Sequence, residues 1–131
     1  MVMSKVLVVD DDAAIRGILR KRLENDGYNV LEAGDGDEGL ALARAHAVDL
    51  FVVDLLMPGL DGLALTRALR ELPAYARTPI FVLSTEGHGA LVAEGTSAGA
   101  DAWIVKPFEP GRLLLAIRRA LARARGADPG V

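Results

Sequence analysis

The sequence D-L-F-V-V-D-L-L-M-P-G-L-D-G, residues 49–62, contains an apolar run that stops abruptly at a carboxylate. The run from Leu50 to Val53 is short, continuous and partly β-branched, which predicts a strand buried on both faces, as in a parallel sheet. Asp54 comes directly after it, at the strand end where open α/β sheets place their ligand crevice. Two interpretations of Asp54 stay open from this stretch alone: a reactive carboxylate, or a residue that merely ends the strand or caps a helix.

Outside this stretch, short apolar runs alternate with amphipathic stretches along the whole chain. We expect strands at residues 5–9, 28–33, 50–53, 80–83 and 102–105, and helices at residues 13–25, 37–45, 62–72, 90–98 and from Pro110 onward. Polar residues interrupt the run at 28–33, which suits an edge strand. Strands that alternate with helices through short connections predict an α/β fold, in which helices cover both faces of a parallel sheet and the crossovers are right-handed.

The first predicted helix has a clear apolar stripe. Its apolar residues recur every three or four positions and are expected to face the core: Ile15, Ile18, Leu19 and Leu23. Charged residues, including Arg16 and Arg20, fall on the other side of this helix. Asp12 stands just before the helix, and we expect it to cap the helix N-terminus.

The composition bounds the class of protein. With 131 residues, 51% of them hydrophobic and 25% charged, the chain has the size of one domain with an ordinary core. We expect that domain over residues 1–125 and a disordered tail or linker stub over residues 126–131. The net charge of −3 gives no electrostatic footprint for nucleic acid, and the absence of cysteine excludes disulfides and thiolate metal sites. No apolar run reaches the length of a signal-peptide core or a membrane span, so we expect a cytoplasmic protein that does not bind membranes.

Each clearly buried strand is followed by a polar group. Asp10 and Asp11 follow the first strand, Asp54 the third, Ser84 the fourth and Lys106 the fifth. Because the carboxyl ends of parallel strands lie at one edge of the sheet, these side chains should converge. Two carboxylates about 5 Å apart repel by roughly 3 kcal/mol at an effective dielectric of ~20, so three of them require a cation. Oxygen ligands without histidine or cysteine favour Mg²⁺, and the whole set indicates phosphoryl transfer with Asp54 as a carboxylate nucleophile.

These polar residues belong to four short motifs: V-V-D-D-D at 8–12, V-V-D-L-L-M-P-G-L-D-G at 52–62, L-S-T at 83–85 and V-K-P-F at 105–108. Their order and spacing resemble those of a bacterial two-component receiver domain, and the resemblance covers about Lys5 to Ala124. It implies a doubly wound, flavodoxin-like parallel sheet of five strands in the order 2-1-3-4-5. The run G-A-D-A-W-I-V-K-P-F at 99–108 is most similar to chemotaxis-type (CheY-type) regulators, which are often single domains that bind a target protein.

By this resemblance, Asp54 is the phosphoacceptor. Asp10 and Asp11 would hold Mg²⁺ together with Asp54 and the backbone carbonyl of Leu56. The leucine side chain departs from family members that place a polar group at this position. The backbone role of Leu56 survives this departure, but any influence of the side chain on hydrolysis of the acyl phosphate changes.

The same resemblance implies a switch. Ser84, in place of the commoner threonine, is the hydroxyl that responds to the phosphoryl group, and Lys106 binds that group. Trp103 occupies the place of the family's switch aromatic, and its alternation partner Val105 should share its face of the strand. Without the resemblance, a lone tryptophan on an edge strand is better explained as part of the core. The bond between Lys106 and Pro107 is commonly cis in this family.

The function implied is a phosphorylation switch and not an enzyme with a substrate of its own. The domain would take its phosphoryl group from a histidine kinase and change the surface of its fourth helix, fifth strand and fifth helix to control a target protein or to dimerise. Two alternatives stay open. The chain could be the receiver module of a longer regulator or hybrid kinase. A small phosphatase of the haloacid-dehalogenase type is disfavoured, because that class needs a second Asp where this chain has Leu56, and also a cap domain.

Two further features have simpler explanations. Residues 34–39, G-D-G-D-E-G, match the dinucleotide-binding pattern G-x-G-x-x-G, but their carboxylates would repel a pyrophosphate. We therefore expect turn and capping glycines there. His46 and His88 have no ligand spacing and are expected at the surface.

Overall fold

The computed structural model describes residues 3–124 and Gly126. In this part of the chain, five parallel strands form one sheet in the order β2-β1-β3-β4-β5. The elements are β1 (Lys5–Val9), α1 (Ala13–Asn25), β2 (Asn29–Ala33), α2 (Gly36–Ala45), β3 (Leu50–Asp54), α3 (Gly62–Glu71), the 3₁₀ turn η1 (Pro73–Tyr75), β4 (Ile80–Ser84), α4 (Gly89–Ala98), β5 (Ala102–Val105) and α5 (Pro110–Ala124). The predicted α/β class, the strand order and the edge position of β2 are confirmed, and η1 is the one element that the sequence pattern did not predict.

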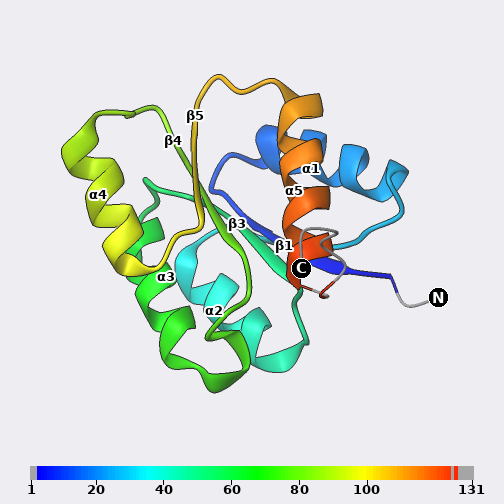
Figure 1. Cartoon of the computed structure of the whole chain (residues 1–131), viewed down its shortest axis with the longest axis horizontal. Helices are drawn as coiled ribbons and strands as arrows, with labels where there is room; N and C mark the ends of the chain where they lie inside the picture. The colour runs from blue at the N-terminus through cyan, green and yellow to red at the C-terminus, as the bar shows by residue number, and fades with distance from the viewer. Residues whose placement is uncertain (1–2, 125, 127–131) are drawn as a thin grey trace.

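The helices cover both faces of the sheet (Figure 1). α1 and α5 pack on one face, against alternate residues such as Val6 and Val8 of β1. α2 and α3 pack on the other face, against Leu7 and Val9, and α4 lies on that same side beside α3. The apolar runs are continuous because successive strand residues point to opposite faces and both faces are covered.

The register of the strands decides where their ends fall. Val9 at the end of β1 lies opposite Val53 of β3, and Ser84 at the end of β4 lies opposite Val105 at the end of β5. Asp54 extends β3 by one residue beyond Val53. The polar residues that end or follow these strands are therefore delivered to a single edge of the sheet.

Three helices begin at aspartate caps. Asp12 accepts hydrogen bonds from the backbone N–H groups of Ala14 and Ile15 at 2.9 and 3.3 Å, which confirms its predicted capping role. Asp35 caps α2 and Asp61 caps α3 through the N–H groups three residues further on. Each cap satisfies a backbone donor that the start of a helix leaves without a partner.

Glycines allow α2 and α3 to close tightly around the loop after β3. A Cβ atom at Gly36 would lie 2.2 Å from the backbone oxygen of Leu60. One at Gly62 would lie 2.5 Å from the backbone oxygen of Asp54. A side chain at either position would force these segments apart. Gly36, in the pattern at 34–39, is thus explained by close packing, whereas the sequence led us to expect a turn or capping role.

The turn η1 fixes the far end of β3. The Tyr75 ring meets Phe51 edge-on with centroids 5.0 Å apart, and its hydroxyl bonds to the backbone carbonyls of Ala43 and His46. Tyr75 therefore joins the end of α2 to the core beneath β3. His46 and His88 are both exposed, as predicted.

Among the described helices, none is long and apolar enough to cross a membrane. The predicted tail lies outside the described residues apart from Gly126, and Arg125 lies outside them as well. The domain boundary at residue 125 therefore stays a prediction.

Candidate functional site

Three carboxylates meet at the edge of the sheet where β1 and β3 end. Asp10, Asp11 and Asp54 each offer an oxygen, and these oxygens all lie within 4.8 Å of one another. Asp10 is fully buried and Asp54 is 7% exposed, whereas Asp11 is open to solvent. Because β1 and β3 are neighbours in the sheet, the parallel register brings the three together as the sequence predicts.

Lys106 brings a cation to this cluster from the end of the edge strand β5. Its ammonium lies 2.8 Å from Asp54 Oδ1 and 3.4 Å from Asp10 Oδ2. Its backbone N–H donates to the Ser84 carbonyl at 2.7 Å, and its bond to Pro107 is cis, as the resemblance implied. The side chain therefore reaches past β4 to the carboxylates, and all the predicted strand-end residues share one edge.

Burial and like charge work against ionisation of Asp54. Burial raises the pKa of Asp54 above its usual range, and the charges of Asp10 and Asp11 raise it further, which together outweigh the hydrogen bond and charge of Lys106. Burial lowers the pKa of Lys106, but the hydrogen bonds and negative charges of Asp54 and Asp10 raise it by more. The pKa of Lys106 is therefore raised above its usual value. A protonated lysine thus offsets only part of the negative charge. The all-oxygen donor set and the remaining charge suit a hard divalent cation.

The protein family described as response regulator receiver domain matches residues 6–118. The chain belongs to this family. It is 44% identical over 121 residues to the transcriptional regulatory protein ResD of Bacillus subtilis, covering 92% of this chain and 49% of that protein. Protein PetR of Rhodobacter capsulatus is also 44% identical, over 90% of this chain and 48% of its own length. This receiver domain therefore spans about half the length of the curated relatives it matches.

Solved structures share the fold over nearly their whole length. The chemotaxis protein CheY4 of Vibrio cholerae has a TM-score of 0.87 and 39% identity, covering 91% of this chain and 99% of that chain. The receiver domain of the sensor histidine kinase PA1611 from Pseudomonas aeruginosa was solved with a magnesium ion in its active site cleft. It has a TM-score of 0.84 and 25% identity, and the match covers 92% of this chain and 99% of that chain. The flavodoxin-like receiver fold and the likeness to chemotaxis-type proteins are thus confirmed.

One charged residue of this receiver domain lies where the sequence pattern did not place it. The pattern assigns Arg16 to the charged outer side of α1, yet its side chain is only 19% exposed. Its guanidinium donates to the backbone carbonyl of Asp10 and, at 3.3 Å, to Glu32 of β2. The signal in the sequence is its place one turn after the capping Asp12, in the helical turn that adjoins the acidic run.

The two predicted switch residues meet at the segment after β4. The buried Ser84 hydroxyl accepts a hydrogen bond from the backbone N–H of Glu86 at 2.9 Å. The indole N–H of Trp103 donates to the Glu86 carbonyl at 2.7 Å. The indole ring lies against Gly95 of α4, where a Cβ atom would come within 2.5 Å of the ring. Ser84 and Trp103 are therefore linked through the backbone of a single residue.

Two apolar side chains near the strand ends are exposed, one two residues after Asp54 and one at the end of β5. Leu56 follows Asp54 by two residues and is 66% exposed. Val105 is 47% exposed, and a Cβ atom at Gly87 would lie 2.9 Å from it, so it faces the same loop as Trp103, as alternation predicts. The metal-binding role of the Leu56 carbonyl stays a prediction.

An apolar hollow of about 360 Å³ adjoins Lys106. It is lined by residues of α1, of the segment after β4 and of the chain after β5: Ile15, Ile18, Thr85, Pro107, Phe108 and Pro110. Ile18 is 54% exposed, so the prediction that its whole stripe faces the core is wrong for this residue. The physical reason is that α1 and the chain after β5 leave between them a space that they do not fill.

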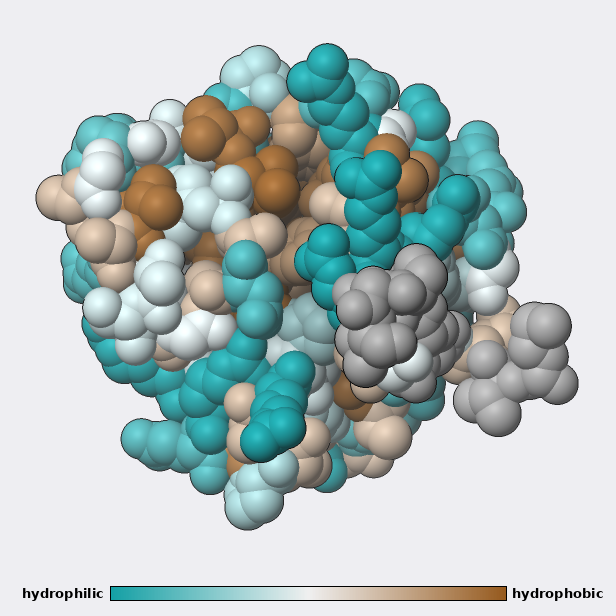
Figure 2. All heavy atoms as spheres, in the orientation of Figure 1, coloured by the Kyte–Doolittle hydropathy of each residue, from teal (hydrophilic) through white to brown (hydrophobic). Residues whose placement is uncertain are grey.

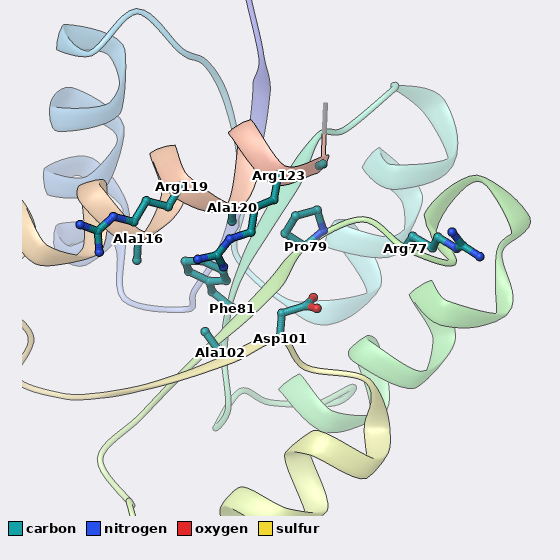
Figure 3. Close-up of a pocket in the computed structure, with 10 residues that line it drawn as sticks. Arg77, Pro79, Phe81, Asp101, Ala102, Ala116, Arg119, Ala120 and Arg123 are labelled. Carbon is teal, nitrogen blue, oxygen red and sulfur yellow. The ribbon is translucent and has the colours of Figure 1, made fainter. Parts of the chain in front are cut away.

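A separate hollow of about 460 Å³ lies near the starts of β4 and β5 (Figure 3). Its floor includes Phe81, and Arg119 and Arg123 reach its rim from α5. The carboxylate of Asp101 in this hollow is bonded by Arg70 at 2.8 Å. None of the predicted site residues lines this hollow. The acidic cluster and Lys106 lie at the opposite end of the sheet, where the strands end.

Asp54→Asn should stabilise the receiver domain at neutral pH in the absence of divalent cations. The folded-state pKa of Asp54 is raised, so the ionised form costs stability, and this cost is absent below the unfolded pKa near ~4. We expect the free energy of unfolding to rise by about 1 kcal/mol at neutral pH, since each close carboxylate pair costs roughly that or more. Denaturant unfolding in EDTA at several pH values measures the difference, which should vanish as the pH falls through the carboxylate range.

Asp49→Asn is the matched control at the other end of the same strand. Its carboxylate is exposed and accepts the backbone N–H of Lys5 at 2.7 Å, so its removal should not stabilise the domain. A stabilisation by Asp54→Asn that persists unchanged in acid would contradict the electrostatic explanation.

Proposed function

We propose that this receiver domain is a phosphorylation switch whose phosphoacceptor is Asp54. The observation that carries the proposal is the position of this carboxylate, nearly buried and 2.8 Å from the Lys106 ammonium, beside Asp10 and Asp11. A carboxylate has no proton to lose before it attacks, so the site needs positive charge near the phosphoryl oxygens and no general base. Membership of the receiver family, whose members are phosphoacceptor signalling switches, supports the assignment.

In this proposal the phosphodonor is the phosphohistidine of a histidine kinase. An Asp54 oxygen forms a new P–O bond while the P–N bond to the donor imidazole breaks. The electron pair of the broken bond stays on the imidazole nitrogen, which takes a proton from solvent. Lys106, already bonded to Asp54, remains beside the transferred group and offsets the charge on its oxygens.

The residues of the acidic cluster fit Mg²⁺. Asp10, Asp11 and Asp54 supply carboxylate oxygens, and Leu56 would add its backbone carbonyl. When bound, Mg²⁺ would neutralise the cluster and the phosphoryl oxygens together. The PA1611 receiver domain, solved with magnesium in its active site cleft, supports this choice of metal.

We assign the approach of the kinase to the apolar hollow beside Lys106. Ile18 is the exposed residue on its α1 side, and Phe108 lines it from the chain after β5. An exposed apolar patch of this kind suits the apolar face of an amphipathic helix. Because the hollow borders Lys106, which contacts Asp54, a kinase helix seated there would hold its phosphohistidine close to the acceptor.

Output in this proposal passes through Ser84 and Trp103. A phosphoryl group on Asp54 offers new acceptor oxygens to the Ser84 hydroxyl. Movement of Ser84 toward them would disturb Glu86, whose backbone bonds to both switch residues. Apolar surface gathers between α4 and α5, around β5 (Figure 2). We therefore propose the surface of α4, β5 and α5 as the output face that binds a target protein.

The similar proteins support two forms of the whole protein. The chain covers nearly all of CheY4, which suits a stand-alone regulator that binds a separate target. It covers about half of ResD, a transcriptional regulator, which suits a receiver module that acts on an attached domain, with phosphorylation-dependent dimerisation as one route. The switch described above serves both forms. A phosphatase of the haloacid-dehalogenase type stays disfavoured, since Leu56 supplies no second carboxylate.

Asp54→Asn tests the acceptor. Incubation with a small phosphodonor and Mg²⁺ should phosphorylate the wild-type domain and leave the variant at background, because the amide is a far weaker nucleophile than the carboxylate. Asp49→Asn, which alters a carboxylate at the other end of β3, should be phosphorylated like the wild type. Intact-mass spectrometry reads the result, and undiminished labelling of Asp54→Asn would refute the assignment.

Ile18→Asp tests the docking surface. Phosphotransfer from a histidine kinase should slow by about tenfold, since a charged side chain would lie in an apolar contact. Labelling by a small phosphodonor should be unchanged, because that donor needs no docking surface. Met3→Asp, at an equally exposed apolar position away from the hollow, is the control. Equal kinase transfer to Ile18→Asp and wild type would place the docking surface elsewhere.

Trp103 reports the output, because it is the only tryptophan of the chain. A phosphoryl mimic such as beryllofluoride with Mg²⁺ should change the emission or quencher access of the wild-type indole, since the mimic acts on the Ser84–Glu86 segment that holds it. Ser84→Ala should blunt the change. Constant emission and quenching while Asp54 is occupied would show that coupling does not run through Trp103.

A further inference from the structure

The guanidinium of Arg16 lies largely inside the domain. Its side chain is 19% exposed, and that of its partner Glu32 is 26% exposed. Burying a guanidinium is costly unless it is paired and hydrogen-bonded, and an apolar side chain would serve the packing of α1 without that cost. The residue therefore needs an explanation beyond helix packing.

Arg16 joins two segments that flank the acidic cluster. Its Nη1 donates to the carbonyl of Asp10, and its Nε donates to Glu32 Oε1 at 3.3 Å. Arg20 bonds the other oxygen of Glu32 at 2.8 Å, and this hydrogen bond is the main reason that the pKa of Glu32 is lowered. Glu32 is thus a stable anion that holds the Arg16 guanidinium against the end of β1.

Asp10 is fixed through all of its polar groups. Its backbone N–H donates to the backbone carbonyl of Ala33 at 3.1 Å, and its Oδ1 accepts from the N–H of Asp12 at 2.9 Å. Its Oδ2 faces the Lys106 ammonium at 3.4 Å. The carbonyl is the remaining group, and Arg16 holds it. The peptide plane that contains this carbonyl also carries the backbone nitrogen of the next residue.

That next residue, Asp11, is the least restrained member of the cluster. It is exposed, and it has no hydrogen bond or ion pair within the described part of the chain. The backbone on either side of Asp11 is held instead. Arg16 bonds the carbonyl of the peptide before this residue, and Asp10 Oδ1 accepts from the N–H of Asp12 after it. We propose that Arg16 is a positioning residue: through the Asp10 carbonyl, it fixes Asp11 in the direction needed to bind a divalent cation. This inference rests on the metal binding proposed above.

Charge alone predicts the opposite effect. Arg16 adds positive charge near a site meant for a cation, so its removal would strengthen cation binding if electrostatics decided the outcome. Positioning predicts weaker binding, because loss of a residue that orients metal ligands typically costs about 10–100-fold in affinity. The sign of the change therefore separates the two effects.

The test measures Mn²⁺ binding by isothermal titration calorimetry on the wild type and on Arg16→Ala and Arg16→Gln. Both variants remove the charge, and the glutamine variant keeps more of the side-chain volume in case the alanine variant does not fold. We expect the dissociation constant to rise about tenfold in each. Arg20→Ala is the matched control: it removes the other guanidinium on Glu32 and leaves the Asp10 carbonyl bonded, so its affinity should match the wild type. Phosphorylation of the Arg16 variants by a small donor should recover as Mg²⁺ is raised, because Asp54 and Lys106 are untouched.

An unchanged or lower dissociation constant in folded Arg16 variants would overturn the inference. An equal loss in Arg20→Ala would also overturn it, because the effect would then belong to the salt-bridge network of α1 in general. A wild-type domain that binds no Mn²⁺ would instead refute the metal site of the proposed function, so the two failures are distinguishable.

Discussion

Three carboxylates that repel one another lie at one edge of the parallel sheet, and the arrangement of the site depends on how this repulsion is offset. Lys106 offsets part of that repulsion, and burial of Asp54 adds to it. The two apolar layers on either face of the sheet supply the stability that lets this local cost persist. The same imbalance suits the site to its proposed chemistry, because a divalent cation would bring the positive charge that the cluster lacks on its own.

The contact between Lys106 and Asp54 also connects the centre of the sheet to its edge. Asp54 ends β3, whereas Lys106 follows β5, and the backbone of Lys106 bonds to Ser84 between them. A change at the carboxylate is therefore close to the segment after β4 without any long chain of intermediates. In the proposed switch, the Ser84 hydroxyl would donate to a phosphoryl oxygen, and its position would then differ from the one in which it accepts from the Glu86 N–H.

The α/β class and the meeting of the strand-end residues could be predicted because they depend on patterns that a sequence displays directly, whereas the strand order was implied by the family resemblance alone. Apolar runs give the buried strands, and parallel topology brings the residues after them to one edge, so Asp10, Asp54 and Lys106 were found from position alone. Arg16 and Ile18 could not be placed in this way, because helical periodicity gives the side of a helix and not the neighbour that the side meets. The bond from Trp103 to Glu86 depends on the path of a loop backbone, which leaves no periodic signal.

The tight joints at Gly36 and Gly62 have a consequence for how such a domain can diversify. The backbone oxygens of Leu60 and Asp54 leave no room for even a methyl group there, so these joints between α2, α3 and the loop after β3 are closed to sequence change. In the opposite half, with α4 and the edge strand β5, the close neighbours of Gly87 and Gly95 are side chains, those of Val105 and Trp103, which can be exchanged together with the glycine. Substitutions can therefore accumulate on the side of α4 and β5, which includes the proposed output face, while the backbone packing of α2 and α3 against the loop after Asp54 stays fixed.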